Sequence, residues 1–304
     1  MTAGNVRAAR VRPVGLLLAL FGALLISPDT LFMRWSEMSG FAMVAWRGLL
    51  MGVAMLLVWA LTSRTRARDL TLLCTGAGLA LVVLQAANAM MFATGVAAGP
   101  AALILMGVAT APVWAAILSW LWLGERTRPV TWVAIVCVMG GIALAVSGEV
   151  SGHGTEFSRL GSIWATIAGL GVGGALAANF VLLRQHGEMP ILLCIGLGAL
   201  LVGITGWFLA GADIATGQIW AIAITGLIIL PVSFFVLSLA ARHTAAANVG
   251  LLMLLETVLG PLWVWLGVGE APTPRMLAGG AIVVGTLALY ILYTARRSQA
   301  RIPV

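Results

Sequence analysis

The sequence contains no lysine, so all 17 of its basic residues are arginine. A phosphate-binding loop of the ATPase type requires a lysine, and so does a cofactor held as a Schiff base. Charged residues of both signs make up only 9% of the 304 residues, whereas hydrophobic residues make up 61%. A soluble core cannot absorb that much apolar surface, so the sequence predicts a protein whose solvent is lipid.

Cysteine and histidine are also scarce, and neither forms a metal-binding pattern. The three cysteines, Cys74, Cys137 and Cys194, lie far apart in the sequence and within apolar runs. The sequence has no CxxC pair and no Cys/His spacing typical of zinc sites, and its three histidines are scattered. We therefore expect no disulfide framework, no metal and no cofactor.

Long apolar runs fill most of the chain. Each holds about 20 residues, enough to cross roughly 30 Å of hydrocarbon at about 1.5 Å per residue. The expected spans lie at about residues 14–33, 39–61, 70–95, 100–123, 129–147, 160–183, 189–210, 217–240, 245–268 and 274–294. The predicted fold class is therefore an all-α membrane protein with ten transmembrane helices.

One signature occurs in both halves of the chain at a spacing of 145 positions without a gap. The repeated positions are Gly124-Glu125 and Gly269-Glu270, Trp120 and Trp265, Pro129 and Pro274, Gly140 and Gly285, and Ala101-Ala102 and Ala246-Ala247. Five spans fit into each half, and an odd number makes the second copy enter the bilayer in the opposite sense. We therefore expect two inverted five-helix repeats, residues 1–150 and 151–304, an organisation typical of secondary transporters.

The arginines predict how the chain is oriented. If the N-terminus is cytoplasmic, 13 arginines flank the cytoplasmic ends of the spans, whereas only Arg34, Arg159 and Arg275 flank the outer ends. The positive-inside rule then places both termini in the cytoplasm. This role in orientation accounts for the net charge of +7, so no nucleic-acid partner is expected.

Two segments carry a resemblance to a known family. They are APVWAAILSWLWLGERTRP at 111–129 and ETVLGPLWVWLGVGEAPTP at 256–274, each with an apolar run, Gly-Glu and a nearby proline. With ten helices in two halves, the chain resembles the EamA-like exporters of the drug/metabolite transporter superfamily. The family's Pro-Val is kept at Pro112-Val113. Thr257 takes the proline position in the second copy, and Pro261 lies one turn later, where it can kink the helix.

The resemblance implies a basket-like fold, with helices 1–4 and 6–9 around a central cavity and helices 5 and 10 at the periphery. It implies a multi-pass protein of the bacterial inner membrane that exports small metabolites, amino acids among them. Some features resemble the YddG-type aromatic amino acid exporters. The expected partners are a small-molecule substrate and the lipid bilayer, and no enzymatic activity is expected. Transport is either coupled to protons, through Glu256, or facilitated diffusion down a gradient.

Three charged side chains lie well inside the expected spans, away from their first and last residues, where lipid makes them costly. Glu256 is near the middle of the ninth span. One interpretation is that its carboxylate binds a substrate amine or a proton. The other is that it packs helices together. Asp29 and Arg47, in the outer halves of the first two spans, form either a gate or clamp for a zwitterion, or a structural salt bridge.

Uncharged side chains complete the expected substrate site. Gln85, Asn88 and Phe92 share one face of the third span. The other candidates within spans are Trp46, Trp114, Asn179 and Thr225. Each polar group has an alternative role in hydrogen bonds between helices, and each aromatic ring has an alternative role in packing.

The leading functional prediction is a secondary transporter that exports small organic metabolites, foremost neutral or aromatic amino acids, by alternating access. The first alternative is a channel or facilitative pore for small polar solutes, for which filter motifs or charged rings are expected. The second is a membrane-embedded lipid-modifying enzyme, for which clustered His, Asp or Lys at an interface is expected. The sequence has neither pattern.

The predicted topology is testable with a reporter fused to either end of the chain. A reporter active only in the cytoplasm should report equally from both ends, because ten spans return the chain to its starting side. The matched control is the same reporter inserted in the loop at 151–158, which should be silent. Activity from only one of the two ends would contradict the topology.

Overall fold

The computed structural model describes residues 13–38, 40–98, 101–150, 159–269 and 273–299, and these ranges contain no strand. The helices of the first half are α1 (Pro13–Ile26), α2 (Asp29–Ser36), α3 (Gly40–Thr62), α4 (Arg66–Leu73), α5 (Gly76–Ala98), α6 (Ala101–Val108), α7 (Ala111–Leu123) and α8 (Pro129–Val150). Those of the second half are α9 (Arg159–Gln185), α10 (Ile191–Ala210), η1 (Gly211–Ala215), α11 (Ile219–Ile224), η2 (Thr225–Ile229), α12 (Leu230–His243), α13 (Ala246–Met253), α14 (Leu255–Val268) and α15 (Pro274–Gln299).

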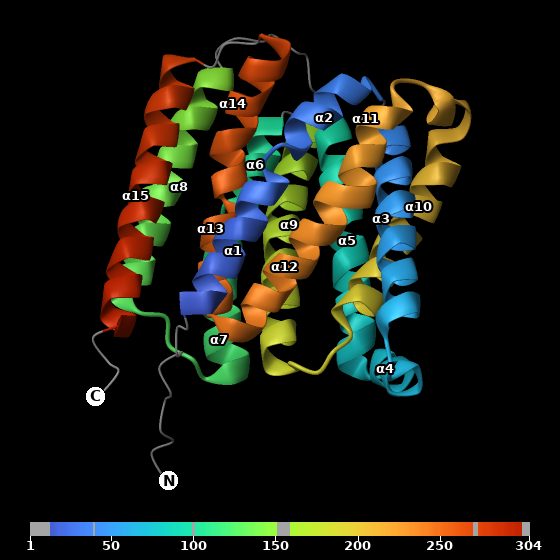
Figure 1. Cartoon of the computed structure of the whole chain (residues 1–304). Coiled ribbons are helices and arrows are strands. Elements are labelled where there is room, and N and C mark those ends of the chain that lie inside the picture. Colours follow the sequence, from blue (N-terminus) through green and yellow to red (C-terminus); the bar gives the residue numbers. More distant parts are fainter. Residues whose placement is uncertain (1–12, 39, 99–100, 151–158, 270–272, 300–304) are drawn as a thin grey trace.

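Ten helical segments of the described ranges are long and apolar enough to cross a membrane, which confirms the predicted fold class. The chain reverses direction at each span, so α1 begins and α15 ends at the same, lower end of the bundle in Figure 1. The largest difference from the predicted spans is in the third, which begins at Gly76 instead of residue 70. The charged residues before it form the separate short helix α4, whose Asp69 accepts hydrogen bonds from Trp59 and Ser63.

Several spans are interrupted helices, a feature that their apolar patterns do not reveal. Pro28 separates α1 from α2, and Pro112 is the second residue of α7, which begins shortly after α6 has ended. In the eighth span the π-helix η2 ends two residues before Pro231. A proline has no N–H group and its ring clashes with the carbonyl four residues earlier, so each of these sites cannot continue a regular helix.

The ninth span is interrupted without a proline. α13 ends at Met253 and α14 begins at Leu255, whereas Pro261, which the sequence placed as the source of a kink, lies inside α14. The interruption therefore occurs more than a turn before Pro261 and directly before Glu256. The local sequence therefore does not account for where α13 ends.

α9 is the central helix of the bundle. It packs against α5, α6, α7, α12 and α13, while α3 packs along α10 and α1 along α12. α8 and α15 pack mainly against each other at one edge of the bundle (Figure 1), the position expected for the fifth and tenth spans.

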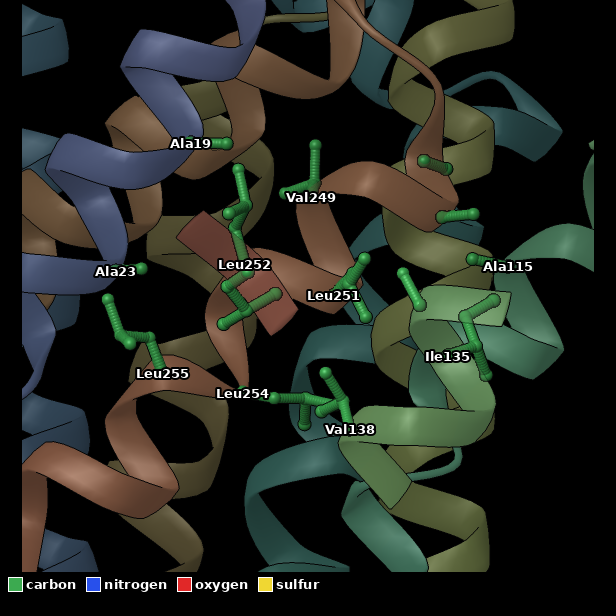
Figure 2. Packing of buried hydrophobic residues seen from close by; sticks show 14 of the residues in the cluster. Ala19, Ala23, Ala115, Ile135, Val138, Val249, Leu251, Leu252, Leu254 and Leu255 are labelled. Atoms are coloured by element: carbon green, nitrogen blue, oxygen red, sulfur yellow. The ribbon is translucent and has the colours of Figure 1, made fainter. Parts of the chain in front are cut away.

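The largest buried cluster surrounds the interruption of the ninth span. Figure 2 shows Leu251, Leu252 and Leu254 between Ala23 of α1 on one side and Val138 of α8 on the other. Lipid tails are as apolar as leucine, so this cluster is stabilised by close packing more than by the removal of apolar surface from water. The packing fixes α13, and therefore the start of α14, relative to both halves of the chain.

Glycines allow α9 to approach its neighbours closely. A Cβ atom on Gly169 would lie 2.6 Å from the carbonyl oxygen of Ile104 in α6, and one on Gly173 would lie 2.9 Å from that of Gly107. Gly174, the next residue, has nothing within 4 Å of its Cβ position and is only half-buried. The central helix therefore touches α6 on one face and borders open space on another.

This contrast predicts unequal effects of one substitution at two positions of α9. Gly169→Ala should lower stability by about 1–3 kcal/mol, because the new methyl group overlaps backbone atoms that cannot move aside. Gly174→Ala is the control and should be neutral or slightly stabilising, since alanine is the better helix former. Thermal unfolding of the purified variants in detergent measures both, and equal melting temperatures would contradict the close packing.

Candidate functional site

Two interrupted spans occupy equivalent places in the two halves of the chain. α6 and α7 end at Val108 and Leu123, and α13 and α14 end 145 positions later, at Met253 and Val268. The repeated glycine explains why α7 ends at Leu123 and α14 at Val268. Gly124 follows α7 with φ of 66°, and Gly269 follows α14 with φ of 85°. A residue in the left-handed backbone conformation at this place ends a helix, and glycine adopts this conformation without strain.

The two interrupted spans contact each other. A Cβ atom on Gly250 of α13 would lie 3.3 Å from Pro112, the second residue of α7. α7 and α13 pack together in the lower half of the bundle, while among the described residues no comparable packing joins α6 to α14 in the upper half. The two spans therefore diverge upward from the level of their interruptions.

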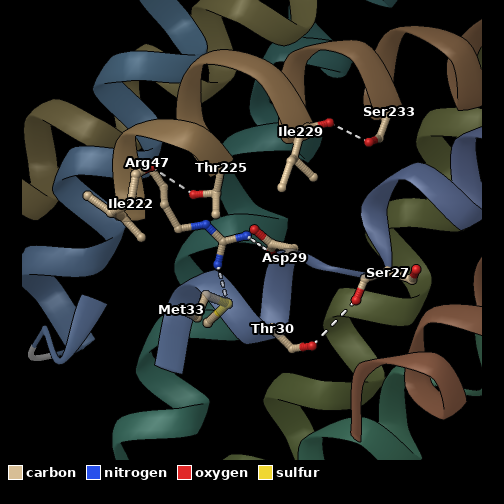
Figure 3. Close-up of polar contacts among 9 residues, drawn as sticks. All are labelled: Ser27, Asp29, Thr30, Met33, Arg47, Ile222, Thr225, Ile229 and Ser233. Atoms are coloured by element: carbon tan, nitrogen blue, oxygen red, sulfur yellow. Dashed lines mark hydrogen bonds and ion pairs between the residues drawn. The ribbon is translucent and has the colours of Figure 1, made fainter. Parts of the chain in front are cut away.

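Asp29 and Arg47 form an ion pair, as one of the sequence interpretations expected. Pro28 ends the preceding helix, so Asp29 starts α2 within the bundle, and its side chain is 3% exposed. Arg47 donates to Oδ2 of Asp29 and, at 2.9 Å, to Sδ of Met33 (Figure 3). The other carboxylate oxygen of Asp29, Oδ1, is buried and has no hydrogen-bond partner.

Glu256 lies close to this pair. It occupies the first turn of α14, is half-buried and makes no hydrogen bond to the described residues. α14 packs against α2, the helix that begins at Asp29. The structure thus brings together the three charged residues that the sequence places within spans.

The polar residues of the third and sixth spans also meet. Asn179 of α9 donates to Oε1 of Gln85 of α5 at 3.4 Å, and its own Oδ1 is buried without a partner. Asn88, one turn above Gln85, is buried, and Phe92, one turn further, is half-buried. α5 and α9 are therefore joined by a polar contact inside the bundle, on the face of α5 that also carries Asn88 and Phe92.

Three other predicted site residues have different surroundings. Trp46 donates to the carbonyl of Ile214 at 2.8 Å and packs edge-on against Trp207, with ring centroids 5.6 Å apart. Thr225 donates to the carbonyl of Ile222 at 2.9 Å within its own span. The polar atoms of both side chains are thus occupied by structural contacts, whereas Trp114, in the first turn of α7, is exposed.

Sequence reasoning missed an ion pair at the lower end of the bundle. Arg184, near the end of α9, donates from Nε and Nη2 to both oxygens of Glu125, at 2.8 and 2.7 Å. Its Nη1 donates at 2.6 Å to the carbonyl of Thr244, between α12 and α13. The sequence placed Arg184 just outside a span and Glu125 in the repeated signature, but nothing in their spacing indicated that they meet. We call this group the Glu125–Arg184–Thr244 latch.

A buried chain of hydrogen bonds extends from the latch. Asn248 donates to the hydroxyl of Thr244 at 3.0 Å, and Tyr290 of α15 donates to Oδ1 of Asn248 at 2.7 Å. Tyr290 also shares a 3.0 Å hydrogen bond with Thr131 of α8. The latch is therefore tied to the paired helices α8 and α15 at the edge of the bundle.

Comparison with known proteins agrees with this architecture. Residues 13–147 match the family model described as the EamA-like transporter family, and the match supports a membrane transporter of small solutes. No curated protein matches the sequence significantly. Among solved structures, one described as "Crystal structure of protein" has a TM-score of 0.74 and 16% identity, covering 93% of this chain and 99% of that chain. That likeness concerns the fold alone.

The latch should contribute more to stability than an exposed ion pair of the same type. The side chains of Arg184 and Glu125 are 11% and 19% exposed, whereas those of Arg68 and Glu188, paired at 2.9 Å, are 62% and 57% exposed. Arg184→Gln should cost about 2 kcal/mol, because it leaves Glu125 and the Thr244 carbonyl without a charged donor. The control, Arg68→Gln, should cost less than about 1 kcal/mol.

A double-mutant cycle measures this difference by thermal unfolding in detergent. Arg184→Gln with Glu125→Gln should cost less than the sum of the single changes, since removing both charges leaves neither unpaired. Additive losses, or equal losses at the exposed pair, would contradict the latch.

Proposed function

We propose that the protein is a secondary transporter that exports small organic metabolites, with neutral or aromatic amino acids as the leading substrate class. In this proposal, residues 1–150 and 151–304 are inverted five-helix repeats. The lower end of the bundle faces the cytoplasm of a bacterial cell, with both termini on that side. The protein moves solutes by alternating access and carries out no chemical conversion.

The observation that carries this proposal is the pair of interrupted spans. α6/α7 and α13/α14 break at the same repeat position, about halfway through the bundle, and they touch beside their breaks. Secondary transporters commonly bind their substrates near the bilayer midplane at discontinuous helices of two related repeats. Irregular backbone at membrane depth is tolerated where it lies within protein or borders a water-filled space.

The proposed substrate site lies beside these breaks. Gln85, Asn88 and Asn179 supply hydrogen-bonding groups, and the unpartnered Oδ1 of Asn179 is an acceptor for a solute N–H. Phe92 and Trp114 supply aromatic surface, which suits a planar side chain. The half-buried Gly174 leaves space for the solute.

The Glu125–Arg184–Thr244 latch fits the role of the cytoplasmic gate. It joins α7 of the first half to α9 and to the start of α13 of the second half. Because α7 and α13 pack below the breaks while α6 and α14 diverge above them, this state is closed at the latch end. Opening towards the cytoplasm then requires the latch to break and the upper end to close.

Exchange in proteoliposomes separates a carrier from a channel. Vesicles containing the protein are loaded with unlabelled phenylalanine, and uptake of labelled phenylalanine is measured. A carrier gives faster uptake into loaded than into empty vesicles. Conductance without any effect of preloading would favour a channel, and conversion of added lipid would favour an enzyme.

Filling the open space beside α9 should block this exchange without unfolding the protein. Gly174→Leu should reduce the exchange rate at least about tenfold, since its side chain occupies the proposed solute space. Gly140→Leu is the matched control, because Gly140 of α8 is exposed and also has nothing within 4 Å. Undiminished exchange by Gly174→Leu would contradict the placement of the site.

A further inference from the structure

The three charged groups inside the bundle do not balance. Asp29 and Glu256 carry two negative charges, and Arg47 carries one positive charge. Charged groups at membrane depth are costly unless they are paired, so two carboxylates beside one guanidinium leave one negative charge to be compensated. The cluster needs one further positive charge when both carboxylates are ionised.

Helix geometry places Glu256 against α2. Glu256, Gly260 and Trp263 are four and three residues apart, so they share one face of α14. On this face, a Cβ atom on Gly260 would lie 2.8 Å from the hydroxyl of Thr30, and the indole of Trp263 donates to the hydroxyl of Ser27 at 3.0 Å. Since Ser27 and Thr30 flank Asp29 in sequence, this face brings Glu256 towards the ion pair.

The existing hydrogen bonds leave acceptors unused on both carboxylates. Arg47 is engaged with Oδ2 of Asp29 and with Met33, and the dashed lines of Figure 3 mark these two contacts. Asp29 as a whole residue is 2% exposed, and its Oδ1 has no hydrogen-bond partner. Glu256 makes no hydrogen bond within the described chain. A buried acceptor without a donor costs free energy, so this arrangement favours a ligand that donates hydrogen bonds and carries positive charge.

We propose that Asp29 and Glu256 form a subsite for one cationic group, which is the primary ammonium of the transported solute or, in its absence, a proton. This inference rests on the proposed transport function and names the part of the solute that is recognised. An ammonium has three hydrogen-bond donors and one positive charge, and the cluster lacks both donors and one positive charge. Arg47 holds Asp29 in place and prevents the subsite from taking two cations.

Competition between ammonium and proton would give the transporter its direction. The charged groups that act on Glu256 are Asp29 and Arg47, while Arg34 on α2 is exposed on the outside of the bundle. At low pH a proton occupies the subsite and weakens ammonium binding, and at high pH the ammonium binds in its place. A proton entering from the acidic side of the membrane would therefore release the solute there.

Direct binding to the purified protein tests the subsite independently of transport. The probes are phenethylamine, which has the ammonium without a carboxylate, and 3-phenylpropionate, which has the carboxylate without an ammonium. Phenethylamine should bind at least about tenfold more tightly, a difference of about 1.4 kcal/mol. Its affinity should rise with pH, and binding should release protons into a weakly buffered solution.

Two variants localise the effect. Glu256→Gln should weaken phenethylamine binding at least about tenfold and abolish proton release, with an unchanged melting temperature because Glu256 makes no hydrogen bond. Glu188→Gln, at an exposed carboxylate, is the control and should change neither property. Asp29→Asn should act in the same direction, but it also removes the partner of Arg47, so Glu256→Gln decides the question.

The outcomes separate this subsite from the transport function. Equal binding of the two probes, or proton release that Glu256→Gln leaves unchanged, would overturn the subsite even if phenylalanine is exchanged. Absence of exchange together with selective, proton-linked phenethylamine binding would contradict the transport proposal and leave the cationic subsite supported.

Discussion

Lipid supplies no hydrogen bonds, so every interrupted helix and every charge in this bundle must be compensated by the protein itself or by what it binds. The chain meets this constraint at most places with α-helices, apolar outer faces and close glycine contacts. Side chains have to supply the compensation at two levels. Near mid-depth, two related spans break beside one another and three charges gather. At the lower end, Glu125 of the first half pairs with Arg184 of the second half, and Arg184 also donates to the carbonyl of Thr244.

The two groups of charges differ in a way that suits different roles. The latch is complete: both oxygens of Glu125 are bonded, and Arg184 makes three hydrogen bonds. The cluster of Asp29, Arg47 and Glu256 is incomplete, with an unpartnered carboxylate oxygen and an excess negative charge. A complete ion pair between the two halves stabilises the arrangement in which they are joined, whereas an incomplete cluster is stabilised by binding a ligand.

Much of this fold could be predicted from the sequence, because membrane spans are long, apolar and flanked by arginine. The repeat also marked Gly124 and Gly269, and the structure gives the reason, since both end a helix in the left-handed conformation. The interruptions were harder to predict. Thr257 lacks the ring that explains the break at Pro112, so no proline marks the equivalent break between α13 and α14. The partner of Glu125 was missed because Arg184 lies 59 residues away and only the folded bundle brings them together.

If one solute site opens to one side of the membrane at a time, a single cysteine in that site reacts from only one face in each state. Gly174→Cys, in a protein whose three native cysteines are replaced, is exposed to a membrane-impermeant thiol reagent from either face. We expect labelling from the outer face only, and a shift towards labelling from the cytoplasmic face when Glu125→Gln breaks the latch. Equal labelling from both faces in the protein with the intact latch would contradict alternating access, and so would labelling from neither face in either protein.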